Sequence, residues 1–321
     1  MSKPIVAVTR IIPETGLAML RDRCELRVWQ DELPPSYAEL CVLAEGAAGI
    51  LCLLSDRIDD SVMDAAGSNI KVISNYAVGY DNIDLTAARR RNIRVGNTPG
   101  VLTETTADLA FALLLSVARR IAEGHAYVQA GRWKTWGPEL LRGYDLSGKT
   151  LGIIGFGRIG KAVARRGTGF NMRTLFYSPS AEQETFGEFN ASKVDLDTVL
   201  KESDFLSLHC PLNEASMYMI NREALMKMKK TAILINTARG KVVVHDDLVE
   251  ALEKGWIAGA GLDVTDPEPI NSDSPLLSMS SVIITPHVGS ATYETRSRMA
   301  VMCAENILAG LEDRSLPYQV V

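Results

Sequence analysis

The chain has 321 residues, enough for two domains of ordinary size, and its 46% hydrophobic and 23% charged residues are typical of a globular protein. A formal net charge of −5 argues against a nucleic-acid-binding surface, which needs clustered positive charge. We find no secretory signal and no run of about 18 apolar residues, so we expect a cytoplasmic protein with no membrane span. The five cysteines are scattered without metal-ligand spacing, which predicts reduced thiols and no metal site; they are Cys24, Cys41, Cys52, Cys210 and Cys303.

The first hundred residues alternate short apolar runs with helical patterns. The apolar runs predict strands at Ile5–Thr9, Gly49–Leu54, Val72–Asn75 and Ile93–Val95. Helical patterns lie between them, for example at Glu14–Arg21 and Tyr37–Glu45. Such alternation predicts βαβ units built on a parallel sheet.

A long apolar helix is predicted at Thr103–Arg120, and a looser stretch follows at Gly131–Pro138. A second alternating series then begins, with strands predicted at Thr150–Ile154, Arg173–Tyr177, Phe205–Leu208, Ala232–Asn236, Gly259–Leu262 and Val282–Ile284. Two such series in one chain predict an α/β fold of two doubly wound lobes, with a ligand site in the cleft between them.

The segment after the predicted strand Thr150–Ile154 has the pattern of a dinucleotide-binding turn. Gly155, Gly157 and Gly160 form a GxGxxG run that leads directly into a helical segment. In such a turn the first glycine permits the tight bend, and the second lets the backbone approach a pyrophosphate at the helix N-terminus. The third glycine allows the helix to pack closely on the strand. The flanking strand and helix make this pattern far more specific than the glycines alone.

The next predicted strand lacks the acidic residue that would select NAD(H). An Asp or Glu at its end would bind the ribose 2′-hydroxyl and repel the 2′-phosphate of NADP(H). Here the strand is followed by Ser178, Pro179 and Ser180. The two serines can donate hydrogen bonds to a phosphate, but the turn has no Arg or Lys, so the compensating charge must come from elsewhere, for which Arg158 is a candidate. We therefore predict that NADP(H) is favoured over NAD(H).

Three polar residues each follow a predicted strand of the second series; they are Arg239, Glu268 and His287. In an open α/β sheet, ligands collect at the carboxyl ends of the strands. A guanidinium group matches a carboxylate with two parallel hydrogen bonds, and an imidazole can donate a proton near neutral pH. A carboxylate beside the imidazole would orient it and favour its charged form. Together these groups are suited to protonating the carbonyl oxygen of a bound 2-oxo acid as a hydride arrives.

His287 is the strongest candidate acid among the four histidines. His125 lies in a polar helical stretch, and His245 is in a segment that resembles a helix start. His209 ends a predicted strand and is a candidate for lining the cofactor site. Taken alone, Arg239 could be a surface arginine and Glu268, between two prolines, part of an ordinary turn. Because Arg239, Glu268 and His287 follow successive strands, a shared functional role explains them better than these separate alternatives.

At this level of detail the sequence resembles the D-isomer-specific 2-hydroxyacid dehydrogenase family, most closely its glyoxylate/hydroxypyruvate reductase branch. The motifs cover nearly the whole chain: Asn75–Asn82, Thr98–Asp108, Gly152–Gly160, Asn236–Gly240, Gly261–Val264 with Pro267–Pro269, and Thr285–Thr292. The resemblance implies two Rossmann-like lobes, with residues 99–291 as the nicotinamide dinucleotide-binding domain. Residues 1–98 and 292–321 would form the substrate domain. It also implies reduction of a small 2-oxo acid such as glyoxylate or hydroxypyruvate, with the same Arg–Glu–His catalytic set.

The resemblance further implies binding residues. Loop amides at Val78 and Gly79 would contact the substrate carboxylate, and Asp263 would hold the nicotinamide carboxamide. The other residues implied around the cofactor are Thr106, Ile159, Pro211, Thr237, Ala238 and Gly289. NADP-using members of the family often carry a basic residue after the second strand, where this chain has Pro179.

Two other functions stay open at this point. Phosphite or formate oxidation could occur on the same scaffold, although formate has no carbinol oxygen to protonate. A non-catalytic NAD(H)-sensing interaction protein is the other, and the intact Arg–Glu–His set argues against it. The sequence does not rank glyoxylate, hydroxypyruvate and pyruvate as substrates. The segment Gly124–Tyr144, with Trp133 and Trp136, is too apolar for a free loop, and the resemblance implies a homodimer formed through it.

Overall fold

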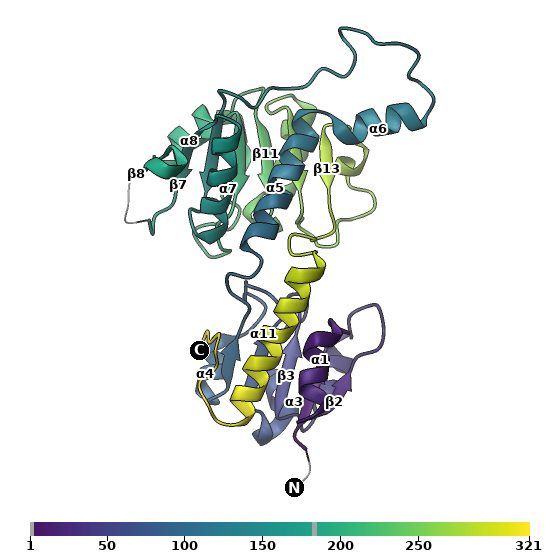
Figure 1. Ribbon diagram of the computed structural model, residues 1–321, viewed down its shortest axis with the longest axis vertical. Helices are drawn as coiled ribbons and strands as arrows, with labels where there is room; N and C mark the ends of the chain where they lie inside the picture. Colours follow the sequence, from purple (N-terminus) through teal and green to yellow (C-terminus); the bar gives the residue numbers. More distant parts are fainter. Residues whose placement is uncertain (1–2, 182–184) are drawn as a thin grey trace. The chain divides into compact units, whose positions relative to one another are not determined.

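The computed structural model describes residues 3–181 and 185–321, which form two compact units. Unit 1 comprises Met1–Leu102 and Ser290–Val321, and unit 2 comprises Thr103–Gly289. The chain builds most of unit 1, then all of unit 2, and its C-terminal helix returns to unit 1 (Figure 1).

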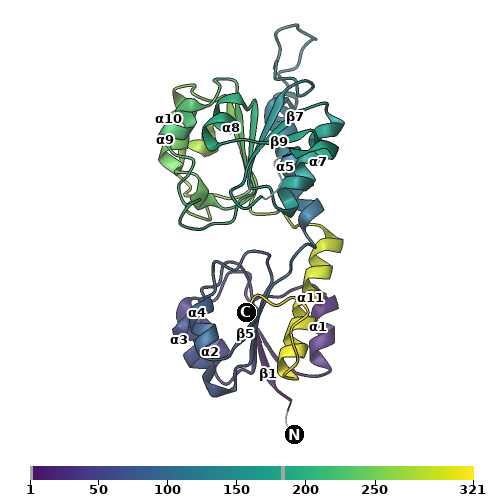
Figure 2. The ribbon, with the colours of Figure 1, turned by 90° about the vertical axis from the view of Figure 1, so that its left-hand side faces the viewer.

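Unit 1 is built on a five-stranded parallel sheet in the order β2-β1-β3-β4-β5. The strands are β1 (Ile5–Val8), β2 (Glu25–Val28), β3 (Gly49–Cys52), β4 (Val72–Asn75) and β5 (Arg94–Gly96). The helices are α1 (Glu14–Arg21), α2 (Tyr37–Ala44), α3 (Asp60–Ala66), α4 (Leu85–Arg90) and α11 (Tyr293–Leu311). Helices α1 and α11 cover one face of the sheet, and α2, α3 and α4 cover the other (Figure 2).

Unit 2 is built on an eight-stranded sheet in the order β13-β12-β11-β10-β6-β7-β9-β8, parallel except for the β8–β9 pair. The strands are β6 (Thr150–Ile154), β7 (Arg173–Tyr177), β8 (Thr185–Phe186), β9 (Ala191–Lys193), β10 (Phe205–Leu208), β11 (Ile233–Asn236), β12 (Gly259–Leu262) and β13 (Val282–Ile284). The helices are α5 (Thr103–Ala118), α6 (Ile121–Gln129), α7 (Arg158–Gly169), α8 (Leu196–Glu202), α9 (Arg222–Lys227) and α10 (His245–Glu253). Apolar residues of α5 and α7 pack on one face, and those of α8, α9 and α10 pack on the other.

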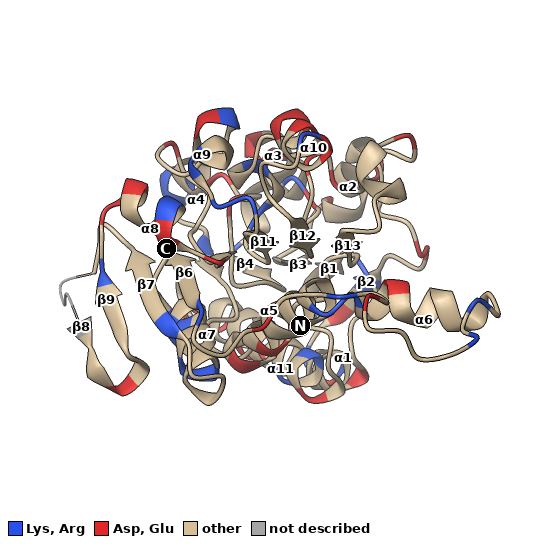
Figure 3. Ribbon diagram, turned by 90° about the horizontal axis from the view of Figure 1, so that it is seen from above, with Lys and Arg blue, Asp and Glu red and all other residues tan. Residues whose placement is uncertain are grey.

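Helices α5 and α7 are also joined by charge. Arg165 and Arg166 of α7 form ion pairs with Glu104 of α5, and Arg166 also pairs with Asp108. Figure 3 marks the basic and acidic residues along the ribbon in blue and red. Each exposed ion pair of this kind contributes little to the free energy of unfolding, roughly 0–1 kcal/mol. The buried apolar faces, rather than the ion pairs, therefore hold these helices on the sheet.

The predicted α/β class, with parallel sheets flanked by helices, is confirmed, and the predicted strands differ from the observed ones by two residues at most at either end. The predicted helix Thr103–Arg120 ends at Ala118, because Arg120 adopts a left-handed backbone with φ 51° before α6 begins. Among the described residues, no helix is both long and apolar enough to cross a membrane.

Candidate active site

The carboxyl ends of three neighbouring strands in unit 2 carry the residues predicted for catalysis. The sheet order β13-β12-β11 places the segments that follow these strands next to one another. His287 follows β13, Glu268 follows β12 and Arg239 follows β11. All three strands are parallel, so the three segments leave the sheet at the same edge.

His287 and Glu268 form a direct pair. Nδ1 of His287 lies 2.6 Å from Oε1 of Glu268, and the side chains are 24% and 37% exposed, so the pair remains accessible to a ligand. The histidine backbone is left-handed, with φ 51°, and its amide donates to the carbonyl of Asp263 at 2.9 Å. Because the carboxylate accepts from Nδ1, Nε2 is the ring nitrogen left for a substrate.

Asp263 organises the loop that carries the histidine. Its carboxylate accepts hydrogen bonds from the Thr285 hydroxyl at 2.6 Å and from the backbone amides of Val288 and Gly289 at 2.8 Å each. Burial raises the pKa of the Asp263 carboxyl, and these three donors act in the opposite direction. Hydrogen bonds to a charged group contribute roughly 1.5–3 kcal/mol each. Asp263 therefore holds both flanks of His287, a role that the sequence did not reveal.

Arg239 is positioned by a turn at the end of β11. The buried Asn236 side chain accepts from the amide of Ala238 at 3.0 Å and donates to the carbonyl of Arg239 at 2.9 Å. The next residue, Gly240, packs against the neighbouring loop so closely that a Cβ there would lie 1.9 Å from the carbonyl oxygen of Thr265. Only glycine fits that contact, which brings the arginine segment against the segment that leads to Glu268.

The glycine-rich turn has the geometry that a dinucleotide requires. Gly155 has φ 92°, and a Cβ there would lie 2.4 Å from the backbone nitrogen of Cys210. A Cβ on Gly160 would lie 2.2 Å from the carbonyl oxygen of Gly155. At Gly157 a Cβ would meet no atom of the described chain within 4 Å, so the N-terminus of α7 is open at this point. The residues present therefore fit a pyrophosphate bound by the backbone amides of the turn.

The remaining residues implied around the cofactor also lie in unit 2. Thr106 donates to the carbonyl of Gly289 at 3.1 Å, and Thr237 Oγ1 lies 3.5 Å from His209 Nδ1. Burial lowers the pKa of His209 to about 3, so its ring is neutral at pH 7 and is not a competing acid. Arg158, Pro211, Ile159 and Ala238 lie on the loops and the helix start beside the strand ends; the first two are exposed and the last two are half-buried.

The turn after β7, where NAD(H) would meet an acid, is contacted by a cation that the sequence did not reveal. Ser178 is buried and Ser180 is exposed, and the amide of Ala181 donates to the carbonyl of Ser178 at 3.1 Å. Nζ of Lys193 donates to the carbonyl of Ala181 at 2.7 Å. Lys193 lies on β9, directly opposite Phe176 of β7. The pairing of β7 with β9 brings this lysine to the turn, and no sequence pattern predicted that pairing.

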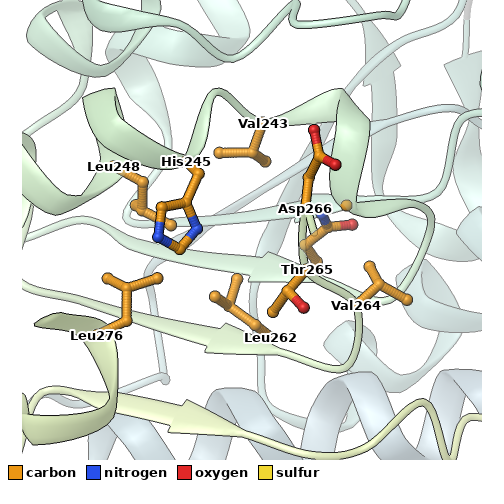
Figure 4. A pocket seen from close by; sticks show the side chains of 10 residues that line it. Val243, His245, Leu248, Leu262, Val264, Thr265, Asp266 and Leu276 are labelled. Carbon is orange, nitrogen blue, oxygen red and sulfur yellow. The ribbon is translucent and has the colours of Figure 1, made fainter. Parts of the chain in front are cut away.

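A small hollow is lined in part by Val264, Thr265 and Asp266, on the segment that leads to Glu268 (Figure 4). Its lining also includes His245, and its volume of about 10 Å³ is far too small for a substrate. Nε2 of His245 lies 3.1 Å from the Ser274 hydroxyl. The prediction that His245 begins a helix is confirmed by α10, and its contact with Ser274 joins the start of this helix to the segment after Glu268.

Comparisons with known proteins identify relatives of this chain. Residues 111–289 match the family model described as D-isomer specific 2-hydroxyacid dehydrogenase, NAD binding domain. The glyoxylate reductase of Korarchaeum cryptofilum is 52% identical over 308 residues, covering 96% of this chain and 92% of the relative. The crystal structure of a protein from Thermus thermophilus has a TM-score of 0.93 and 50% identity, covering 99% of this chain and 100% of the other.

A further solved structure is a glyoxylate/hydroxypyruvate reductase from Sinorhizobium meliloti in complex with NADP and malonate. It has a TM-score of 0.87 and 31% identity, and the match covers 100% of this chain and 97% of the other. Unit 2 therefore carries a nicotinamide-binding domain. The chain belongs to the D-isomer-specific 2-hydroxyacid dehydrogenase family.

Proposed function

We propose that this enzyme reduces glyoxylate, and related small 2-oxo acids such as hydroxypyruvate, to the corresponding 2-hydroxy acids. The observation that carries the proposal is the His287–Glu268 pair, with Nδ1 and Oε1 2.6 Å apart, on the segments after β13 and β12, at the same sheet edge as Arg239 after β11. The glyoxylate reductase names of close relatives support the substrate class.

The proposed chemistry needs one hydride and one proton. Reduced nicotinamide supplies the hydride to the carbonyl carbon of the substrate. Nε2 of His287 donates the proton to the carbonyl oxygen, and Glu268 stabilises the imidazolium that holds this proton beforehand. The products are the 2-hydroxy acid and the oxidised cofactor, and the histidine regains its proton from water.

The substrate carboxylate is held by positive charge and by backbone donors. Arg239 offers a planar guanidinium that matches a carboxylate, and Asn236 keeps its backbone in place. Backbone amides of the loop containing Val78 and Gly79, in unit 1, are proposed to bind a substrate carboxylate. Asp263 is proposed to hold the nicotinamide carboxamide in addition to the histidine loop.

For the cofactor we propose NADP(H) in preference to NAD(H). The turn Ser178-Pro179-Ser180 has no acid to repel a 2′-phosphate. Lys193 places a positive charge beside this turn, which supplies the compensation that the turn itself lacks. Arg158, exposed at the first residue of α7, offers a second cation near the pyrophosphate turn.

We also propose that the protein is a cytoplasmic homodimer. Helix α6 and the segment after it extend away from the sheet of unit 2 (Figure 1). Trp133 and Trp136 of this segment are 61% and 79% exposed, and such apolar side chains are commonly covered by a partner. The five cysteines are free in the structure, which is consistent with a reducing compartment.

A steady-state panel tests the proposed function. Glyoxylate, hydroxypyruvate and pyruvate are each assayed with NADPH and with NADH, and formate and phosphite are assayed with the oxidised cofactors. We expect saturable reduction of at least glyoxylate, faster with NADPH. Turnover of formate or phosphite alone, or cofactor binding without any turnover, would contradict the proposal.

A further inference from the structure

Two buried asparagines hold the loop that follows β4 in unit 1. Nδ2 of Asn97 donates to the carbonyl of Val78 at 2.7 Å, and Nδ2 of Asn75 donates to the carbonyl of Gly79 at 2.8 Å. Asn75 is 0% exposed and Asn97 is 7% exposed. Since a buried amide group that loses its partner is costly, each asparagine stays paired with its carbonyl.

The two asparagines stand side by side at the carboxyl edge of the sheet. Strands β4 and β5 pair with Ser74 opposite Gly96, so the asparagines are the next residues on neighbouring strands. The backbone amide of Thr98 donates to the carbonyl of Ala77 at 3.0 Å. Three successive carbonyls of the loop are therefore held by Asn75, the last residue of β4, and by Asn97 and Thr98, which follow β5.

The direction of the carbonyls determines the direction of the amides. In a trans peptide the N–H points opposite to the C=O of the preceding residue, and the peptide bonds of this loop are trans. The N–H groups of Gly79 and Tyr80 are thus turned away from the strand ends. Within residues 3–181 and 185–321, neither amide donates a hydrogen bond to the backbone. Successive N–H groups presented on one side form a concavity that binds anions.

The carboxamide of Asn75 is itself fixed in one orientation. Its Nδ2 also donates to Oδ1 of Asn82 at 2.9 Å, while the Asn82 amide group donates to the carbonyls of Leu53 and Asp56 at 3.0 Å each. The thiol of Cys52 donates to Oδ1 of Asn75 at 3.3 Å. Because these partners identify the donor and acceptor ends of the group, a rotated carboxamide would break several bonds at once.

We propose that Asn75 and Asn97 are positioning residues for substrate selection. They aim the amides of Gly79 and Tyr80 at the carboxylate of a 2-oxo acid without contacting the substrate themselves. This inference rests on the proposed function. In unit 1 the carboxylate would then be recognised by preorganised backbone amides. No charged side chain of this loop would be needed for that recognition.

Asn97 is the cleaner residue to change, since its side chain makes one hydrogen bond within the described part of the chain. Asn97→Leu removes the donor at nearly constant size, and Asn97→Asp tests whether an acceptor can substitute. We expect both variants to raise the KM for glyoxylate and the inhibition constant of oxalate by roughly three- to tenfold. This is the fold-change expected from the loss of one hydrogen bond. The kcat at saturating glyoxylate and the Kd of NADPH should stay within about twofold of the wild-type values, because the loop adds nothing to proton transfer.

Ser203→Ala is the matched control. Ser203 is also 0% exposed and donates a side-chain hydrogen bond to the carbonyl of Val199 in unit 2, so it shares no partner with the loop after β4. Its thermal midpoint should fall as that of Asn97→Leu does, with unchanged KM and oxalate inhibition. If Asn97→Leu keeps the wild-type KM and oxalate inhibition, the inference is wrong while the proposed function stands. If the wild-type enzyme neither reduces glyoxylate nor binds oxalate, the proposed function fails, and this inference fails with it.

Discussion

Units 1 and 2 share a parallel-sheet architecture but present different chemistry at the carboxyl ends of their strands. In unit 2 these ends carry ionisable side chains, Arg239, Glu268 and His287. In unit 1 the loop after β4 presents backbone amides, aimed by Asn75 and Asn97. If the proposed roles hold, the comparison teaches that the sheet supplies only the location, and the loops decide whether an edge transfers a proton or binds an anion.

The largest effect is expected from removing the proposed proton donor of unit 2. His287→Ala removes the proposed proton donor, so kcat for glyoxylate should fall roughly 10²–10⁴-fold. Cofactor affinity should be preserved, because the glycine turn is untouched. His125→Ala, a change at an exposed histidine of α6, is the control. A kcat within about threefold of wild type would show that His287 is not the acid.

The next effect concerns the cationic anchor in unit 2. Arg239→Lys keeps the charge but loses the planar fork, so the KM for glyoxylate should rise about tenfold or more. Arg222→Lys, at an exposed arginine that pairs with Glu250, should leave KM unchanged. Unchanged KM and kcat in Arg239→Lys would mean that the residue is structural.

The cofactor turn gives the third prediction. Ser178→Asp should shift the NADPH/NADH ratio of kcat/KM strongly toward NADH, because like-charge repulsion costs on the order of several kcal/mol whereas a neutral hydrogen bond contributes about 0.5–1.5 kcal/mol. Lys193→Met should shift the ratio the same way by about tenfold, the loss of one charged hydrogen bond. Lys201→Met, at a lysine that pairs with Asp197, serves as the control. A tenfold preference of the wild type for NADH would overturn this interpretation of the turn.

The smallest effect on catalysis is expected from the surface segment after α6. Replacing Trp133 and Trp136 together by Ser should convert a dimer into a monomer in sedimentation, with kcat changed by less than about threefold, since both side chains are exposed on a segment outside the sheet. Leu277→Ser, at another exposed apolar residue of unit 2, should leave the dimer intact. A wild-type chain that sediments as a monomer at micromolar concentration rules out the proposed assembly.

Much of the fold could be predicted because buried parallel strands are continuous apolar runs. Strand β10 (Phe205–Leu208) is one such run and is observed within its predicted bounds. Strand β2 was missed because it lies at the edge of its sheet and mixes Glu25 and Arg27 with apolar residues. Strand β9 (Ala191–Lys193) was missed because Ser192 and Lys193 make it polar, so it forms no apolar run.

In the candidate site, too, only the residues with a local sequence pattern could be predicted. Arg239, Glu268 and His287 could be identified from their place after apolar strands, and the structure confirms that Glu268 contacts His287. Lys193 and Asn97 could not be identified, because each acts on a carbonyl that is distant in sequence. Their partners follow from strand pairing and loop geometry, which depend on the whole sheet rather than on any local pattern.

The central claim is that His287 of unit 2 transfers the proton whereas the loop after β4 of unit 1 binds the carboxylate. The most direct test measures kcat and oxalate inhibition in both His287→Ala and Asn97→Leu. We predict a crossed result: His287→Ala loses kcat but keeps the wild-type oxalate inhibition constant within about threefold, whereas Asn97→Leu keeps kcat and weakens oxalate inhibition roughly three- to tenfold. Loss of the same quantity in both variants, or weakened oxalate inhibition in His287→Ala alone, would contradict the account.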